Sequence, residues 1–366
     1  MQSYEIAPGV EAALRDFRVP ARLGFGLVTA PVMYSVEYQD GAWGRGSLLP
    51  YGPIDVWPGS RVLQYAELVF EGLKAYRVGQ PWPNLFRPQD NCRRLARSAE
   101  RLSMPAVPEP LFLEALDAVA GALAPFVPLQ SGRALYLRPF LFGTESGYML
   151  RNSTTFRFMV MASPVEPYAT GAIRVAIERT DVRAVVGGVG QAKAAANYAA
   201  SLRASTAAVA RGCAVALWLD AGPQRTIQEL SGMNLFAVID GGLVTPALDG
   251  AILPGITRDS VITLARHRGQ RVRERRMPID ELLQQIANGA CSELFACGTA
   301  AIVSPIAALV DGDGAEHAPA RVDGVAAELR EALLAIQERR VADPFGWTRD
   351  VARPPAAAPA TRALSG

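Results

Sequence analysis

Short apolar runs of strand length alternate with helical segments along the whole chain, and this alternation restricts the fold to one that mixes α and β structure. The runs of strand length are VMYSVEYQ, FEGLKAYR, ALYLRPFLFG, FRFMVMAS, AIRVAIE, CAVALWLD, LFAVID and SELFACG. The segments with helical spacing are NCRRLARSAERLSM, PLFLEALDAVAGALAPF, residues 194–211, a helix that begins near Thr257, DELLQQIA and residues 322–340. We therefore expect a mixed α and β (α+β) fold.

A stretch rich in Pro, Gly and Tyr around SPVEPYATG interrupts this pattern and indicates an inter-domain linker. In a chain of 366 residues we expect two domains. The expected boundaries are a small α/β domain over 1–165, a linker over 166–175 and a large domain over 176–340. Residues 341–366 are expected to form a C-terminal tail, whose Pro/Ala-rich end is predicted to be disordered.

The composition excludes several classes of protein. Half of the residues are hydrophobic and the formal net charge is +2, which excludes extensive disorder and gives no field that favours nucleic acid or an anionic membrane. The arginine-rich run RHRGQRVRERR lacks aromatic residues, so we interpret it as a solvated strand face. No apolar run is long enough to span a bilayer, and the first residues do not form a signal peptide.

Cysteine and histidine are too scarce for a recognisable metal site. The four cysteines follow no CxxC spacing, and there are only two histidines, neither in a ligand-like context. We therefore expect no bound metal and no disulfide framework. This cysteine usage favours a reducing compartment, and we expect the protein to be cytoplasmic.

Lysine is the most informative residue type, because only Lys74 and Lys193 occur among 37 Lys and Arg residues. Lys193 follows a glycine-rich loop, GGVGQAK, and precedes Tyr198 near the start of an Ala-rich helix. An amine at such a loop suits a nucleophile that meets a bulky planar partner, although a solvated lysine in a helix N-terminal turn is an alternative. For Lys74, in FEGLKAYR, an ion pair on a sheet face is favoured.

Three further segments contain groups that could bind a cofactor. Glu229 lies just before an expected strand in IQELSGMNLF, where a carboxylate could hold a cationic ring nitrogen or simply be exposed. PGITRDS and ACGTAA offer backbone N–H groups and hydroxyls for a phosphate, or are ordinary Gly-Thr turns. Arg94 could add a cation to the same phosphate or be solvated.

Taken in chain order, six segments resemble the sequence blocks of one enzyme family. The segments are YAELVFEGLKAYR, LYLRPFLFGTE, GGVGQAKAAANYAAS, QELSGMNLF, LPGITRDS and ELFACGTAAIVSP. Their order and spacing are similar to those of the branched-chain-amino-acid aminotransferases, class IV aminotransferases that use pyridoxal 5′-phosphate (PLP). The resemblance extends from about residue 20 to 340. It implies the two-domain fold type IV of PLP enzymes, as in D-amino-acid aminotransferase, with PLP bound in the large domain.

The resemblance implies a role in cofactor binding for each matching residue. Lys193 would bind PLP covalently and act as the catalytic residue. Glu229 would face the pyridine nitrogen, and Tyr198 would face the ring 3-oxygen. The residues expected at the phosphate are Arg94, Ile256, Thr257 and Thr299.

The resemblance also implies how substrates bind. The groups expected at substrate carboxylates are Tyr65, Tyr136, Arg138 and the amides of Thr299 and Ala300. Phe70 and Tyr168 would line the side-chain pocket. Tyr148 and Leu150 occupy positions that reach in from the other subunit of a homodimer. The implied reaction is transamination between Leu, Ile or Val and 2-oxoglutarate, which gives a branched-chain 2-oxo acid and L-glutamate.

Some positions depart from the family pattern. Ala301 and Ser304 stand where animal members carry the cysteines of a CxxC motif, so no thiol switch is expected. Gly232, Val28 and Tyr148 also differ from the residues most common in the family. These changes keep open an alternative in which the same chemistry acts on an aromatic or specialised amino acid. A D-amino-acid aminotransferase, an aminodeoxychorismate lyase and a non-enzymatic binding protein are further alternatives that the block pattern disfavours.

Overall fold

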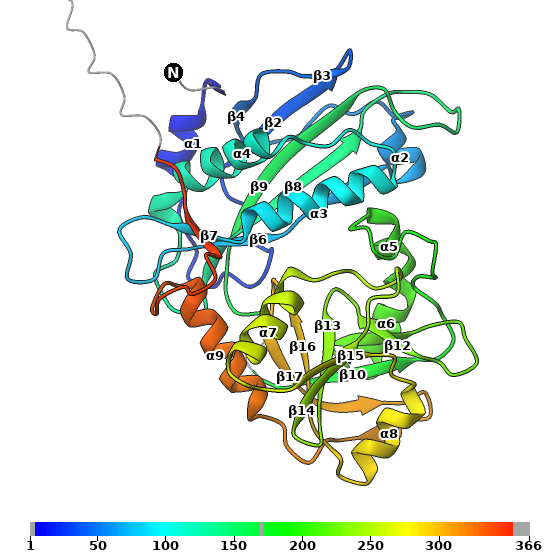
Figure 1. Ribbon diagram of the computed structural model, residues 1–366. Helices are drawn as coiled ribbons and strands as arrows, with labels where there is room; N and C mark the ends of the chain where they lie inside the picture. Colours follow the sequence, from blue (N-terminus) through cyan, green and yellow to red (C-terminus); the bar gives the residue numbers. More distant parts are fainter. Residues whose placement is uncertain (1–3, 169–170, 354–366) are drawn as a thin grey trace, which may run out of the picture.

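Two β-sheets, one from each half of the chain, organise the computed structural model, which describes residues 4–168 and 171–353. Apart from a strand near the end of the described chain (Thr348–Asp350), which returns to the first sheet, the strands of the first sheet end at Val165 and those of the second begin at Ile173. Figure 1 shows the two sheets in separate bodies, with the N-terminal one above the C-terminal one. This change of sheet falls between Val165 and Ile173, and the expected domain and linker boundaries stay a prediction.

The first sheet has the strand order β1-β4-β2-β9-β8-β6-β7-β19, and β3 and β5 pair beside it with β2 and β8. Its strands are β1 (Glu5–Ile6), β2 (Val32–Gln39), β3 (Ala42–Trp43), β4 (Ser47–Pro50), β5 (Leu68–Phe70), β6 (Leu73–Tyr76), β7 (Asn84–Phe86), β8 (Ala134–Gly143), β9 (Phe156–Val165) and β19 (Thr348–Asp350). The long antiparallel pair β8–β9 forms its centre, with Ala134 opposite Val165 and Gly143 opposite Phe156. Alternate residues of both strands are apolar, which buries one face under α4.

The second sheet has the order β12-β11-β10-β17-β16-β13-β14-β15, with β18 paired to β17. Its strands are β10 (Ile173–Glu178), β11 (Val215–Leu219), β12 (Ile227–Leu230), β13 (Asn234–Ile239), β14 (Gly242–Pro246), β15 (Val272–Arg275), β16 (Cys291–Gly298), β17 (Ile302–Val310) and β18 (Glu316–His317). Parallel and antiparallel pairs are mixed in it. Near-continuous apolar runs such as VALWL in β11 are buried on both faces.

The helices cover these sheets, and all but the short α1 and α2, which the sequence analysis did not predict, overlap segments expected to be helical. They are α1 (Val10–Asp16), α2 (Arg61–Tyr65), α3 (Pro88–Arg101), α4 (Glu109–Ala122), the short 3₁₀ turn η1 (Ala124–Phe126), α5 (Ala195–Ala200), α6 (Leu202–Ala210), α7 (Ile256–His267), α8 (Ile279–Ala287) and α9 (Val325–Gln337). The helix expected over 194–211 is divided at Ser201 into α5 and α6. The expected mixed α and β architecture is confirmed. None of the helices in the described part of the chain is long and apolar enough to cross a membrane.

The segment FEGLKAYR forms two strands, β5 and β6, and not the single strand that its apolar pattern predicts. The break falls at Glu71 and Gly72. A Cβ atom on Gly72 would lie 2.1 Å from the hydroxyl oxygen of Tyr136, so only glycine fits at this point. The adjacent Glu71 side chain is fully buried, where it pairs with Arg94. The break therefore leaves room for the Tyr136 hydroxyl and places Glu71 beside Arg94. Tyr136 and Arg94 both line the cavity described below.

Part of the expected C-terminal tail returns to the first sheet. Strand β19 pairs antiparallel with β7, and Arg349 donates two hydrogen bonds to the carboxylate of Asp117 on α4. The indole N–H of Trp82 donates to the carbonyl of Val351 at 2.8 Å. These contacts connect the end of the second half of the chain to the first sheet. The predicted disordered end lies mostly outside the described residues, over 354–366.

Candidate active site

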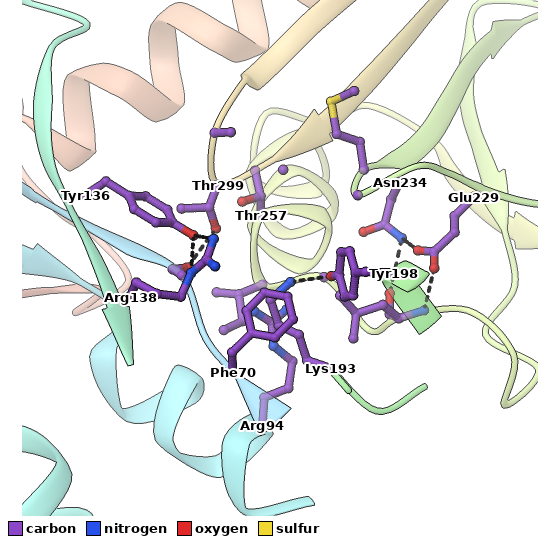
Figure 2. A pocket seen from close by; sticks show the side chains of 18 of the residues that line it. Phe70, Arg94, Tyr136, Arg138, Lys193, Tyr198, Glu229, Asn234, Thr257 and Thr299 are labelled. Carbon is purple, nitrogen blue, oxygen red and sulfur yellow. Dashed lines mark hydrogen bonds between the residues drawn. The ribbon is translucent and has the colours of Figure 1, made fainter. Parts of the chain in front are cut away.

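A cavity of about 580 Å³ lies between the two sheets, and residues from both sheets line it. Its size and mostly apolar walls are typical of a small-molecule site. Eleven of the residues singled out from the sequence line it: Phe70, Arg94, Tyr136, Arg138, Lys193, Tyr198, Glu229, Ile256, Thr257, Thr299 and Ala300. Figure 2 labels all of these residues except Ile256 and Ala300 and shows the labelled side chains converging from separate elements.

Lys193 is held by the first sheet although it precedes α5 in the second half of the chain. Its backbone N–H donates to the hydroxyl of Ser98 on α3 at 2.9 Å, and its carbonyl accepts from the N–H of Phe70 at 3.0 Å. Ala194 forms an antiparallel bridge with Val69. This short pairing fixes the backbone from which the lysine side chain extends.

The Lys193 amine projects into the cavity. Its Nζ donates to the hydroxyl oxygen of Tyr198 at 2.8 Å and lies 4.7 Å from the centroid of the Phe70 ring (Figure 2). The turn before it approaches another segment closely, because a Cβ on Gly190 would lie 2.3 Å from the carbonyl oxygen of Ala251. Gly190 of GGVGQAK therefore allows the loop to pack closely against Ala251, in addition to leading the chain toward the cavity.

Glu229 lies within β12 and not just before a strand, as the sequence suggested. Its side chain is buried, and its residue is only 4% exposed. Asn234 donates to one carboxylate oxygen at 3.2 Å, and Arg183 places a nitrogen 2.6 Å from the other. Burial raises the pKa of Glu229 to about 7, whereas Arg183 acts to lower it. Sequence reasoning missed Arg183, because nothing in DVRAVVGG marks one arginine among so many.

The start of helix α7 offers the cavity groups that can bind an anion. Helix α7 begins at Ile256 after Gly255, and no side chain caps its N-terminus, so its first N–H groups are available. Beside it, the Arg94 guanidinium donates two hydrogen bonds to Glu71, at 2.7 and 2.8 Å, and one to the carbonyl of Pro254. These bonds use three of the five N–H groups of the guanidinium and orient it.

A second cation faces the cavity from β8. The Arg138 guanidinium lies 4.7 Å from the centroid of the Phe70 ring and donates to the hydroxyl oxygen of Tyr136 at 3.0 Å. No carboxylate in the described part of the chain pairs with it. The cavity wall includes four apolar residues that sequence reasoning missed, namely Phe25, Leu68, Phe140 and Met161. Phe140 could have been found, because it lies two residues from Arg138 on the same strand face.

Four expected site residues lie outside this cavity. Tyr65, Tyr148 and Leu150 are on the surface, where the Tyr65 hydroxyl donates to the Tyr148 carbonyl at 2.6 Å. Tyr168 is also exposed, but its ring packs edge-on at 5.8 Å against Phe25, which lines the cavity. Within one chain, these four side chains therefore do not complete the cavity.

Comparison with known proteins identifies the family. Residues 68–309 match the family model of the class IV amino-transferases. Branched-chain-amino-acid transaminase 1 of Bacillus subtilis is 42% identical over 338 residues, which are 91% of this chain and 95% of that protein. The chain belongs to the branched-chain-amino-acid aminotransferases.

Solved structures of this family support the same assignment. The branched-chain aminotransferase of Thermoproteus uzoniensis, determined with norvaline, has a TM-score of 0.71 and 27% identity, covering 87% of this chain and 99% of that one. The T.th. enzyme, complexed with N-(5′-phosphopyridoxyl)-L-glutamate, has a TM-score of 0.69 and 29% identity, covering 87% and 98%. The resemblance stated from the sequence and the expected fold type IV are confirmed, and the cofactor is PLP.

The cavity of this aminotransferase has the groups that PLP requires. A helix N-terminus beside a guanidinium suits a phosphate, a buried carboxylate suits a protonated pyridine nitrogen, and a primary amine suits an aldehyde. The Asn234 and Arg183 contacts already hold the carboxylate in place before any ring nitrogen meets it. The described residues contain no cluster of His, Cys, Asp or Glu that could hold a metal ion.

The raised pKa of Glu229 predicts how stability depends on pH in the cofactor-free aminotransferase. The folded state binds this proton more tightly than the unfolded chain does. The Glu229 contribution to stability is therefore fully present below about pH 4.5 and is lost as pH rises through about 7. As pH rises from 5 to 8, the free energy of unfolding of the wild type should fall by up to about 3 kcal/mol relative to that of Glu229→Gln, which cannot titrate at this position. Urea denaturation across this range measures the difference, and parallel curves for the two proteins would contradict it.

Proposed function

We propose that this aminotransferase exchanges an amino group between a branched-chain L-amino acid (Leu, Ile or Val) and 2-oxoglutarate, giving the branched-chain 2-oxo acid and L-glutamate. One observation carries the proposal: the Lys193 amine and the Arg138 guanidinium each lie 4.7 Å from the centroid of the Phe70 ring. One apolar cavity thus contains both a reactive amine and a cation without a carboxylate partner.

Lys193 is the proposed attachment point of PLP and the catalytic base. The Tyr198 hydroxyl, 2.8 Å from Nζ, would contact the ring 3-oxygen, and Glu229 would keep the pyridine nitrogen protonated. The proposed phosphate ligands surround the start of α7 and are Arg94, Ile256, Thr257 and Thr299. Support for this arrangement comes from the lining of the cavity by all of these residues.

PLP supplies a ring that accepts electron density from the substrate α-carbon. When substrate displaces it from the cofactor, the Lys193 amine would act as the general base for the substrate α-proton and then as the general acid that returns it. Because Tyr198 lies within hydrogen-bond distance, it holds this amine close to the reacting atoms. The apolar walls exclude water, which strengthens the electrostatic contacts inside the cavity.

Both substrates must fit the same pocket. Phe70, Phe140 and Met161 provide apolar surface for an aliphatic side chain. The distal carboxylate of glutamate would instead pair with Arg138, assisted by the Tyr136 hydroxyl. The backbone amides of Thr299 and Ala300 are proposed to bind the α-carboxylate, which both substrates share.

A homodimer is the proposed assembly. Trp57, Leu63, Tyr148, Met149 and Leu150 form an exposed apolar patch, in which Tyr148 is 80% and Leu150 is 83% exposed. Backbone bonds of Arg61 to Glu145 and of Gly147 to Gly59 join the two loops that carry the patch. Exposed apolar surface of this kind marks a protein interface. Tyr148 and Leu150 would then approach the partner's cavity, while Tyr65 and Tyr168 lie at its rim.

The cytoplasm is the proposed location. All four cysteines of the chain are free and buried. Burial raises the pKa of Cys92 to about 11 and of Cys297 to about 12, which keeps these thiols protonated. Unpaired thiols agree with a reducing compartment.

A panel of amino donors tests the substrate assignment. With 2-oxoglutarate as acceptor, we expect Leu, Ile and Val to have kcat/KM values well above those of Phe and Tyr. Lys193→Ala should retain the fold but lose both the visible band of the lysine-linked cofactor and turnover. Equal or higher efficiency with an aromatic donor would favour the alternative substrate, and a persistent lysine-linked band in Lys193→Ala would exclude this lysine as the attachment point.

Arg138 should discriminate between the two substrates. Arg138→Leu removes a charge-assisted contact to the distal carboxylate, so we expect kcat/KM for glutamate to fall about 10- to 100-fold. The value for leucine should change less than about threefold, because leucine has no distal carboxylate. Single-turnover kinetics with each amino acid measure this split, and Arg138→Lys is the charge-retaining control. Equal losses for both donors would show that Arg138 does not recognise the distal carboxylate.

The oligomeric state tests the apolar patch. Leu150→Asp should shift the sedimentation coefficient from that of a dimer toward that of a monomer and lower the activity. Val209→Asp on α6, where the side chain is also exposed (66%), is the matched control and should change neither. A wild-type protein that sediments as a monomer while fully active would contradict the proposal.

A further inference from the structure

The second lysine of the chain, Lys74, lies behind the cavity and has no role in the function proposed above. Its residue is 3% exposed, and its Nζ donates to the carbonyl oxygen of Ala300 at 2.9 Å. The ion pair that the sequence favours for it is not present among the described residues. A lysine buried so deeply costs stability, so its position calls for a physical reason.

Lys74 contacts the turn over residues 299–301, which joins β16 to β17 and lines the cavity with Thr299 and Ala300. A second hydrogen bond connects the same two segments, because the Thr299 hydroxyl donates to the carbonyl of Gly72 at 3.1 Å. Thus β6 and the residue just before it hold a turn that belongs to the other sheet. Hydrogen bonds of Thr299 and Ala300, the first two residues of the turn, therefore hold it in place.

The turn needs such support because its backbone is strained. Ile302, the first residue of β17, has a φ angle of +63°, in the left-handed region that β-branched residues rarely adopt. Such a conformation costs about 1–3 kcal/mol and persists only when neighbouring structure holds it. Lys74 is the buried donor that faces this turn.

The direction of the Ala300 carbonyl matters for the cavity. Ala300 lines the cavity, whereas Lys74 lies outside the lining, so the carbonyl oxygen points away from the space where substrate would bind. Were the 300–301 peptide to turn over, that oxygen would face the cavity and repel a carboxylate. In the described part of the chain, the N–H groups of Thr299 and Ala300 donate to no other group.

We propose that Lys74 is a positioning residue, which holds the 299–301 turn so that its free amides can receive the α-carboxylate of the substrate. This role rests on the function proposed above. Burial lowers the pKa of Lys74 to about 7, with Arg330 acting in the same direction and Glu338 against it. Because a neutral amine also donates hydrogen bonds, the contact with Ala300 is retained in both protonation states.

The test is the affinity of the PLP-loaded enzyme for 4-methylpentanoate, a carboxylate with the carbon skeleton of leucine and no amino group. Its Kd is measured from the change in the visible cofactor band. In Lys74→Met we expect the Kd to rise about tenfold or more and the KM for leucine to rise in parallel, with kcat changed much less. The cofactor band without ligand should match that of wild type.

Tyr76→Phe is the matched control. Tyr76 lies two residues from Lys74 on the same strand face and is also buried. The substitution removes the hydrogen bond from the Tyr76 hydroxyl to Gln337, which does not involve the turn. Its Kd should stay within about twofold of wild type. Lys74→Arg, which keeps a donor, should recover part of the affinity and provides the test if Lys74→Met does not fold.

The outcomes separate the two proposals. A Kd in Lys74→Met within twofold of wild type, or an equal loss in Tyr76→Phe, would overturn the role of Lys74 alone. A wild-type enzyme that neither binds 4-methylpentanoate nor transaminates leucine would overturn the proposed function and this inference together. If affinity for 3-methylbutylamine, which lacks the carboxylate, falls as much as that for 4-methylpentanoate, the effect is not on carboxylate binding and the inference fails.

Discussion

The short backbone pairing between residues 69–70 and 193–194 decides where the amine of Lys193, the proposed nucleophile, lies. Lys193 belongs to the second half of the chain, yet Phe70 and Ser98 of the first half hold its backbone. The two halves must therefore dock before the amine has a defined position. Docking also forms the cavity, because residues from both halves line it, so the position of the proposed nucleophile and the walls around it result from the same contacts.

Several charges are buried beside the cavity, and contacts within the described part of the chain pair them. Arg94 pairs with Glu71, and Arg183 lies beside Glu229. A buried pair of this kind adds little net stability, but removal of one partner is costly. These pairs therefore serve to orient Arg94 and Glu229, which line the cavity. Lys74 follows the same principle with a neutral partner, the carbonyl of Ala300.

Much of the fold could be predicted from periodicity, because β2, β8 and most helices have strong local patterns that agree with their burial. The break between β5 and β6 could not be, since it depends on a tyrosine hydroxyl that arrives from β8. The position of Lys193 after a glycine-rich loop is a local feature, so it could be recognised from the sequence. Arg183, beside Glu229, and Ala300, beside Lys74, are distant from these residues in sequence, and one sequence contains no pattern that pairs them. The roles proposed for the surface residues Tyr148 and Leu150 depend on the proposed second subunit.

The central claim is that Lys193, and not Lys74, carries the cofactor. The PLP-loaded enzyme can be reduced with sodium borohydride, digested, and analysed by peptide mass spectrometry. Because the chain has only these two lysines, the assignment is unambiguous. The account predicts the phosphopyridoxyl mass increase on the peptide that contains GGVGQAK and on no other. The same increase on the peptide that contains FEGLK, or on neither lysine, would contradict it.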